Sequence, residues 1–252
     1  MKQLLRMPGL TVTRDAHGVP HIDADSETNL YRGLGWVHGT DRALQLLLAR
    51  MAGRGRLTEQ LPGAKMLAAD KAFRRLGFHL GAEEQVAALP PDVYVLLAAY
   101  CEGVNRALRG TAPWELRLFG VRHPDPWTPA DSVVLTRLVG FVSLAQSQGE
   151  MERLLVQMVR AGVPGDLLPE LFPKGLAGLD EDLVARVDLG EPLVPPEVRW
   201  TPYVPRPIAS NNWVVGPSRT RSGRAVLSGD PHLELGCRRS GARSSARGRA
   251  AG

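Results

Sequence analysis

The sequence predicts an α+β protein in which a mostly helical region precedes a strand-rich one. Three observations support this fold class. Helical periodicity dominates the first 172 residues, prolines crowd residues 173–209, and apolar and polar residues alternate from residue 210. The chain has 252 residues, of which 44% are apolar and 23% charged. This composition is typical of a compact folded protein and excludes disorder throughout.

A short hairpin is predicted at the start of the chain. Residues 11–15 and 21–25 alternate apolar and polar side chains around a break that contains glycine and proline. Ser26 is well placed to cap a following helix, and Thr40 with Asp41 to cap a second one. We therefore expect two strands and then two short helices.

Further helices are predicted as far as residue 172. Apolar residues recur with the helical period over three stretches, at residues 66–77, 80–89 and 91–108. A hydroxyl cap, a proline at the first helical position and an acid at the third predict a helix from residue 129 to about 147; these are Thr128, Pro129 and Asp131. Another helix is expected over residues 150–161. Cys101 lies in an apolar helical pattern, which favours a small buried side chain over a reactive thiol.

The net charge of +5 is concentrated at the C-terminal end. Residues 237–252 contain five arginines and no acid, so residues 1–236 are formally neutral. This tail consists of Arg, Ser, Gly and Ala apart from Cys237 and has no apolar period, so we expect it to be disordered. It is interpreted as a solvated tail or as coding sequence that lost its frame, in preference to a nucleic-acid-binding arm. Nucleic acid is therefore not an expected partner.

Several classes of activity lack their sequence signals. The chain has no GxSxG, P-loop or GxGxxG motif, which leaves ordinary serine hydrolases, nucleotide hydrolases and dinucleotide enzymes without support. The two cysteines have no metal-ligand spacing, and no organic cofactor is expected. No apolar run reaches the roughly 18 residues of a membrane span, and the N-terminus lacks an export signal. No membrane association is expected; the location is unknown, cytoplasmic as written, or periplasmic or secreted if an upstream signal was lost.

Four stretches of the chain, in order, carry the most specific signal. They are RDAHGVPHIDADS (14–26), GLGWVHGTDRALQLLLARMAGRGRLTE (33–59), WTPADSVVLTRL (127–138) and SNNWVVGPSRTRSGRAVLSGDPHLEL (210–235). By residue type alone, SNNW is a cluster of turn formers that opens a strand. Together the four stretches resemble landmarks of the penicillin acylase (penicillin amidase) family. The resemblance extends over residues 11–235 and stops at the Arg-rich tail.

The resemblance implies an N-terminal-nucleophile hydrolase, a precursor that cleaves itself between Ala209 and Ser210. Residues 1–172 would be the α-chain-like region and residues 173–209 would contain a spacer. Residues 210–236 would begin the β chain and the αββα sandwich of these enzymes. The oxyanion donors of the family lie further downstream than this chain extends. We therefore expect an incomplete sandwich, inactive on its own and prone to aggregation.

Cleavage at this bond would give Ser210 its own base. A free α-amino group has a reference pKa of about 7.7–8.0 and accepts a proton near neutral pH, which an amide nitrogen cannot do. The resemblance implies that Ser210 attacks the linear amide bond of a small, β-lactam-like acylated amine. The attack would form an acyl-enzyme. The α and β chains of one precursor would be partners. Cephalosporin acylase activity, acyl-homoserine-lactone acylase activity and a non-enzymatic remnant are the alternatives.

The resemblance also assigns supporting roles. They are nucleophile support for Asn211, Asn212 and His232, and the wall of the acyl pocket for Phe141, Ser143 and Leu144. Asn211 and Asn212 have alternatives as strand-start or turn residues, His232 as a structural residue, and Phe141 and Leu144 as core residues. Glu150 occupies a position that resembles a calcium ligand of the family, but a calcium site takes six to eight oxygens. An exposed glutamate at a helix start is an equal alternative.

Overall fold

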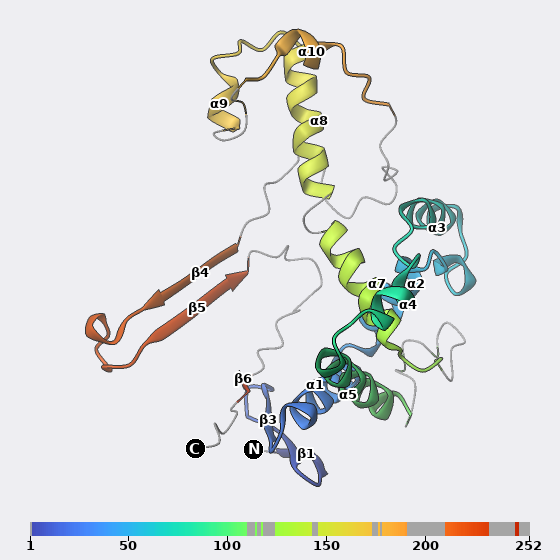
Figure 1. Cartoon of the computed structure of the whole chain (residues 1–252), viewed down its shortest axis with the longest axis vertical. Coiled ribbons are helices and arrows are strands. Elements are labelled where there is room, and N and C mark those ends of the chain that lie inside the picture. Colours follow the sequence, from blue (N-terminus) through green and yellow to red (C-terminus); the bar gives the residue numbers. More distant parts are fainter. Residues whose placement is uncertain are drawn as a thin grey trace. The chain divides into compact units, whose positions relative to one another are not determined.

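The computed structural model describes residues 2–109, 114, 117, 124–142, 146–172, 176, 178–190, 210–231 and 245–246. Figure 1 shows both helices and strands, which confirms the predicted α+β class. Two compact units are present. The larger contains residues up to Val139, and the other contains Gly140–Leu193 and Arg199–Arg239. Every helix in the described ranges is too short or too polar to span a bilayer.

The first unit begins with a sheet of strand order β1-β2-β3-β6. The strands are β1 (Lys2–Met7), β2 (Leu10–Arg14), β3 (Pro20–Ala24) and β6 (Ser245–Ala246). The antiparallel β2–β3 pair confirms the predicted hairpin. β1 was not predicted, because this edge strand buries none of its side chains fully and so shows weak alternation. β6, which pairs with β3 in parallel, lies in the Arg-rich tail, whose other residues are outside the described ranges.

Helices form the rest of the first unit. They are α1 (Glu27–Asp41), α2 (Ala43–Gly53), the 3-10 turn η1 (Leu57–Glu59), α3 (Ala64–Leu76), α4 (Ala82–Ala87), α5 (Pro91–Leu108) and α7 (Pro129–Gly140). The Ser26 cap is confirmed, because its hydroxyl accepts a hydrogen bond from the Asn29 N–H at 3.3 Å. The cap predicted at Thr40 is wrong. Its hydroxyl donates to the Trp36 carbonyl, and Asp41 instead accepts from Arg14 at 2.7 Å.

The sheet packs on α1 through one apolar face. Leu10, Val12 and Ile22 are buried there against Val37 of α1. A second apolar cluster joins α2 and α5 to Trp127, which is 1% exposed. Its buried members are Ala43, Leu46, Leu47, Cys101, Val104, Leu108 and Trp127. The expectation for Cys101 is confirmed, since the residue is 4% exposed and burial raises the pKa of its thiol to about 11.

α1 and α5 approach each other closely because glycines lie at their contact. A Cβ atom at Gly35 would overlap the Tyr100 carbonyl oxygen. One at Gly103 would overlap the Arg32 carbonyl oxygen and lie 2.7 Å from the Trp36 nitrogen. Any larger residue at these two positions would force the backbones apart. The two helices therefore meet backbone to backbone.

The second unit contains further helices and a separate hairpin. Its elements are α8 (Gln146–Arg160), α9 (Leu168–Leu171), α10 (Glu181–Ala185), β4 (Ser210–Val215), the 3-10 turn η4 (Pro217–Arg219) and β5 (Val226–Pro231). The helix predicted from 129 to 147 ends early, at Gly140, where the backbone widens into a π turn over residues 141–142. α10 lies within the stretch predicted to be a spacer.

The close contact of α1 and α5 at their glycines predicts that adding a single methyl group there lowers the stability strongly. Gly103→Ala should lower the free energy of unfolding by about 2–3 kcal/mol, because the new methyl group overlaps the Arg32 carbonyl oxygen. Urea denaturation followed by circular dichroism measures this change. Gly149→Ala in α8 is the control, because a Cβ there meets nothing within 4 Å and alanine favours a helix. Equal stability of Gly103→Ala and the unsubstituted chain would contradict the contact.

His38 predicts a pH dependence of stability. Burial between α1 and α5, next to the Tyr100 hydroxyl at 3.0 Å, lowers the pKa of His38 below its usual 6.5. The unfolded chain therefore binds this proton more readily than the folded chain. The contribution of His38 to stability is complete above about pH 6.5 and is lost as pH falls through the lowered pKa. Urea midpoints across this range should fall less steeply in His38→Gln, whereas the exposed His17→Gln should retain the slope of the unsubstituted chain.

Candidate active site

The predicted nucleophile lies at the open end of the β4–β5 hairpin. Ser210 is the first residue of β4 and pairs with Pro231, the last residue of β5. Because proline has no N–H, it donates no ladder hydrogen bond at this end of the pair. Ala209 precedes the strand and lies outside the described residues. The backbone at Ser210 thus occupies the strand end next to the predicted cleavage bond.

Both faces of this hairpin carry exposed apolar side chains. Strand alternation places positions 210, 212 and 214 on one face and the intervening positions on the other. Directly opposite residues share a face. Exposed fractions are 66% for Val214 and 73% for Leu227 on the face of position 210, and 51% for Trp213 and 43% for Val226 on the other. A sheet with apolar groups on both faces is typical of one that protein covers on both sides.

The two predicted support residues on β4 differ in position. Asn212 shares the face of position 210 and lies opposite Gly229, where a Cβ atom would be only 3.1 Å from the Asn212 Oδ1. Asn211 lies on the other face, opposite Asp230. Of the two asparagines, Asn212 is therefore the one on the face of the nucleophile position. His232, the third predicted support residue, lies outside the described residues.

The predicted pocket and calcium residues come from another stretch of the second unit. Phe141 lies half-buried in the π turn after α7, while Ser143 and Leu144 are outside the described residues. Glu150 lies in the second turn of α8, so its interpretation as a helix-start residue is wrong. In the described ranges, no group of three His, Cys, Asp or Glu could hold a metal ion. A calcium site takes six to eight oxygens, and the calcium role of Glu150 stays a prediction.

Two of the stretches that resemble the family, residues 33–59 and 127–138, meet in the first unit at a buried carboxylate. Asp131, which is 2% exposed, accepts from Arg54 at 2.7 Å and lies 3.6 Å from Arg50. It also forms the predicted reciprocal cap of α7, since the Thr128 N–H donates to the Asp131 carboxylate and the Asp131 N–H to the Thr128 hydroxyl. The cap was predicted correctly. The ion pairs of Asp131 with Arg54 and Arg50 were not predicted, because these partners lie more than seventy residues away in the chain.

Trp127 of the same stretch is held from three sides. Asn105 of α5 exchanges two hydrogen bonds with its backbone, at 2.6 and 2.9 Å, and its indole N–H donates to Ser132 at 2.9 Å. The Arg50 guanidinium lies 5.7 Å from the centre of its ring. Trp127 therefore connects α2, α5 and α7.

A second buried carboxylate shapes the loop after α2. Asp70 of α3 accepts hydrogen bonds from the backbone N–H groups of Leu57 and Thr58, at 2.7 and 2.8 Å, and from the Thr58 hydroxyl. The role of Asp70 was not predicted, because nothing near it in the chain indicates partners twelve and thirteen residues away. In the first unit, the family-like stretches thus contain residues that stabilise the fold.

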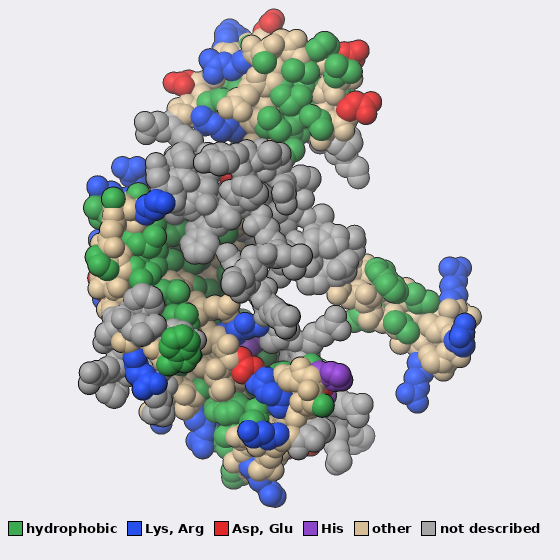
Figure 2. All heavy atoms as spheres, turned by 180° about the vertical axis from the view of Figure 1, so that it is seen from behind, with side chains coloured by type: hydrophobic (Ala, Val, Ile, Leu, Met, Phe, Trp, Pro, Cys, Tyr) green, Lys and Arg blue, Asp and Glu red, His purple; other side chains and the backbone are tan. Residues whose placement is uncertain are grey.

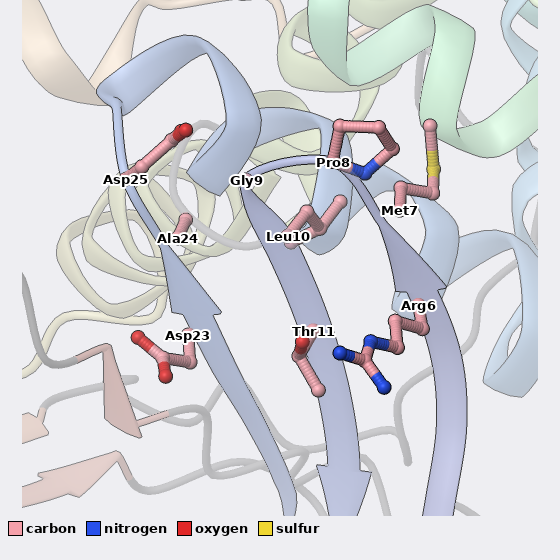
Figure 3. Close-up of a pocket in the computed structure, with 9 residues that line it drawn as sticks. All are labelled: Arg6, Met7, Pro8, Gly9, Leu10, Thr11, Asp23, Ala24 and Asp25. Atoms are coloured by element: carbon pink, nitrogen blue, oxygen red, sulfur yellow. The ribbon is translucent and has the colours of Figure 1, made fainter.

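An open pocket of about 890 Å³ lies on the N-terminal sheet. Figure 3 shows Arg6 of β1, Thr11 of β2 and Asp23 of β3 side by side, as the strand register requires. At the rim of the pocket, the Asn29 side-chain amide donates a hydrogen bond to Asp25 at 2.7 Å. This bond contributes most to lowering the pKa of Asp25 below its usual value. The pocket contains none of the predicted site residues.

The buried ion pairs predict a strong effect of one substitution. Asp131→Ala should lower the free energy of unfolding by about 3–5 kcal/mol, because Arg54 and Arg50 lose their buried partner and α7 loses its cap. Glu59→Gln is the control, because it removes an exposed ion pair with Arg56 and should cost less than about 1 kcal/mol. Similar urea midpoints for the two variants would contradict this role of Asp131.

Comparisons with known proteins find relatives over most of the chain. The chain matches the sequence model described as Penicillin amidase over residues 10–239. It is 35% identical over 253 residues to the penicillin acylase 2 proenzyme of Pseudomonas sp. (strain SE83), a match that covers 90% of this chain and 31% of that protein. It is 30% identical over 239 residues to the acyl-homoserine lactone acylase QuiP of Pseudomonas fluorescens (strain Pf0-1), covering 90% and 29%.

A solved structure supports the fold. The thermostable penicillin G acylase from Alcaligenes faecalis superposes with a TM-score of 0.52 at 23% identity, covering 76% of this chain and 96% of that chain. The present chain spans less than a third of the length of the two curated relatives described above. The family match covers most of the chain, and this protein belongs to the penicillin amidase family.

Proposed function

We propose that this chain is part of a self-processing amide hydrolase in which Ser210 becomes an N-terminal nucleophile. The observation that carries the proposal is the position of Ser210, which opens β4 inside the stretch matched by the penicillin amidase family. The penicillin acylase and acyl-homoserine lactone acylases among its relatives support this reaction class. Its substrate would be a small acylated amine with a linear amide bond.

The proposed processing step needs only groups of the chain and water. The Ser210 hydroxyl attacks the carbonyl carbon of Ala209, the peptide C–N bond breaks, and an ester with a free Ser210 amine forms. Water then hydrolyses the ester, which leaves a carboxylate on Ala209 and the hydroxyl on Ser210. Ser210 is the first residue of β4, so the bond proposed to break lies at the end of the strand and not within it.

The proposed hydrolysis uses the liberated amine as the base. The amine accepts the hydroxyl proton while the oxygen attacks the amide carbonyl, and the substrate amine leaves with a proton. Water then releases the acyl group from the ester. Asn212, on the face of position 210, would help to position the nucleophile.

The lengths of the relatives support processing. One relative is named a proenzyme, and this chain covers only 31% of it, whereas it covers 96% of the solved penicillin G acylase chain. A solved chain so much shorter than a proenzyme is what division of such a protein into separate chains would give. The α and β chains of one precursor are thus the proposed partners.

Two alternatives stand beside this proposal. The acyl-homoserine lactone acylases among the relatives favour that substrate class as a second candidate beside penicillins and cephalosporins. A non-enzymatic remnant is the alternative from another class. Self-cleavage separates the remnant from the enzyme.

Intact mass and N-terminal sequencing of the purified chain test the proposal. We expect a fragment that begins at Ser210. Ser210→Ala should abolish this fragment, because it removes the attacking oxygen, while Ser210→Cys should retain it, because a thiol performs the same acyl shift.

Two results would count against the proposal. Cleavage between Ala209 and Ser210 that persists in Ser210→Ala would mean that another protease cuts there. A chain that stays intact in all three forms would favour the remnant.

A further inference from the structure

We propose that the arginine tip of the β4–β5 hairpin, formed by Arg219, Arg221 and Arg224, docks on the acidic segment 180–188 of a second copy of this chain. The contact goes beyond amide hydrolysis and does not depend on it. It is an interaction surface with a carboxylate-bearing partner.

The arginine tip is an ordered, concentrated positive charge. The Thr220 hydroxyl lies 3.1 Å from the Pro217 carbonyl oxygen and 2.7 Å from the Arg224 carbonyl oxygen, and Gly223 adopts a positive φ of 65°, so the turn has a defined shape. Residues 210–229 include no Asp or Glu. The three arginines are exposed, and none of them forms an ion pair with another described residue. Figure 2 shows their basic side chains gathered at one end of the hairpin.

The acidic segment is the complementary feature of the same unit. Its carboxylates belong to Asp180, Glu181, Asp182 and Asp188, all exposed, and in the described ranges none of them forms an ion pair. The segment has a defined shape, because Asp180 caps α10 by accepting from the Leu183 N–H at 2.9 Å. Its end is anchored to α8, since Arg153 donates to the carbonyls of Leu189 and Gly190, at 2.9 and 3.1 Å.

The two surfaces suit each other in chemistry. Guanidinium groups bind carboxylates through two parallel hydrogen bonds, which favours arginine at contacts between proteins. Apolar groups lie next to both charged sets, with Leu227 73% exposed beside the tip and Leu183 57% exposed in the segment. Single exposed ion pairs contribute little, so the contact depends on several charges that act together.

The geometry points to a second copy because each chain carries both halves of the contact. The tip and the segment belong to one unit, yet no ion pair between described residues joins them. Each copy can offer its tip to the segment of the other. Two such reciprocal contacts close a symmetric dimer.

Charge reversal with mixing tests the dimer. The tip variant is Arg219→Glu, Arg221→Glu, Arg224→Glu, and the segment variant is Glu181→Arg, Asp182→Arg. Sedimentation equilibrium should show a dimer of the unsubstituted chain in about 50 mM NaCl that dissociates in about 500 mM NaCl. Each variant alone should dimerise at least about tenfold more weakly, because like charges then meet. An equimolar mixture should restore the dimer, since both reciprocal contacts become attractive again.

A matched control and three results decide the outcome. Glu83→Arg, Glu84→Arg reverses two exposed acids in the first turn of α4, the same arrangement as in α10, and should leave the dimer unchanged. Circular dichroism confirms that each variant is folded. A monomeric unsubstituted chain at low salt, a mixture that stays monomeric, or an equal loss in the control would overturn the proposal. Binding of a short DNA duplex that depends on the three arginines, without dimerisation, would instead assign the tip to nucleic acid.

Discussion

The backbone contact between α1 and α5 is the constraint on which the first unit depends. Gly35 and Gly103 let the two helices touch without intervening side chains. On its other side α1 covers the N-terminal sheet, and α5 holds Trp127 through Asn105. A shift of either helix would therefore be transmitted to both apolar clusters. The stability of this unit follows from a contact that two glycines permit.

The residues behind the family resemblance divide into two groups. In the first unit they are structural: the Arg50 and Arg54 side chains meet Asp131, and Trp127 fills the space between three helices. In the second unit the resemblance includes the hairpin that Ser210 opens. Because a buried carboxylate with two arginine partners is costly to disturb, such residues are expected to recur with the fold itself.

Local signals predicted local structure well. The β2–β3 hairpin, the Ser26 cap, α5, the reciprocal cap of α7 and the strand β4 that SNNW opens all follow from residues close to one another in the chain. The errors have the opposite origin. Thr40 and Asp41 look like a cap but bond to Trp36 and Arg14, and Asp70 bonds to a loop that only the fold brings near. The site shows the same limit: the strand position of Ser210 was predictable, whereas the roles of Asn212, Phe141 and Glu150 depend on contacts with distant segments and stay predictions.

Hydrogen exchange of the backbone amides tests the central claim most directly. If the glycine contact organises the first unit, the amides of α1 and α5 should exchange together, with the slowest rates in that unit, and Gly103→Ala should accelerate both helices by a similar factor. Faster exchange of α5 alone, with α1 unchanged, would show that the two helices are stabilised independently and would contradict this account.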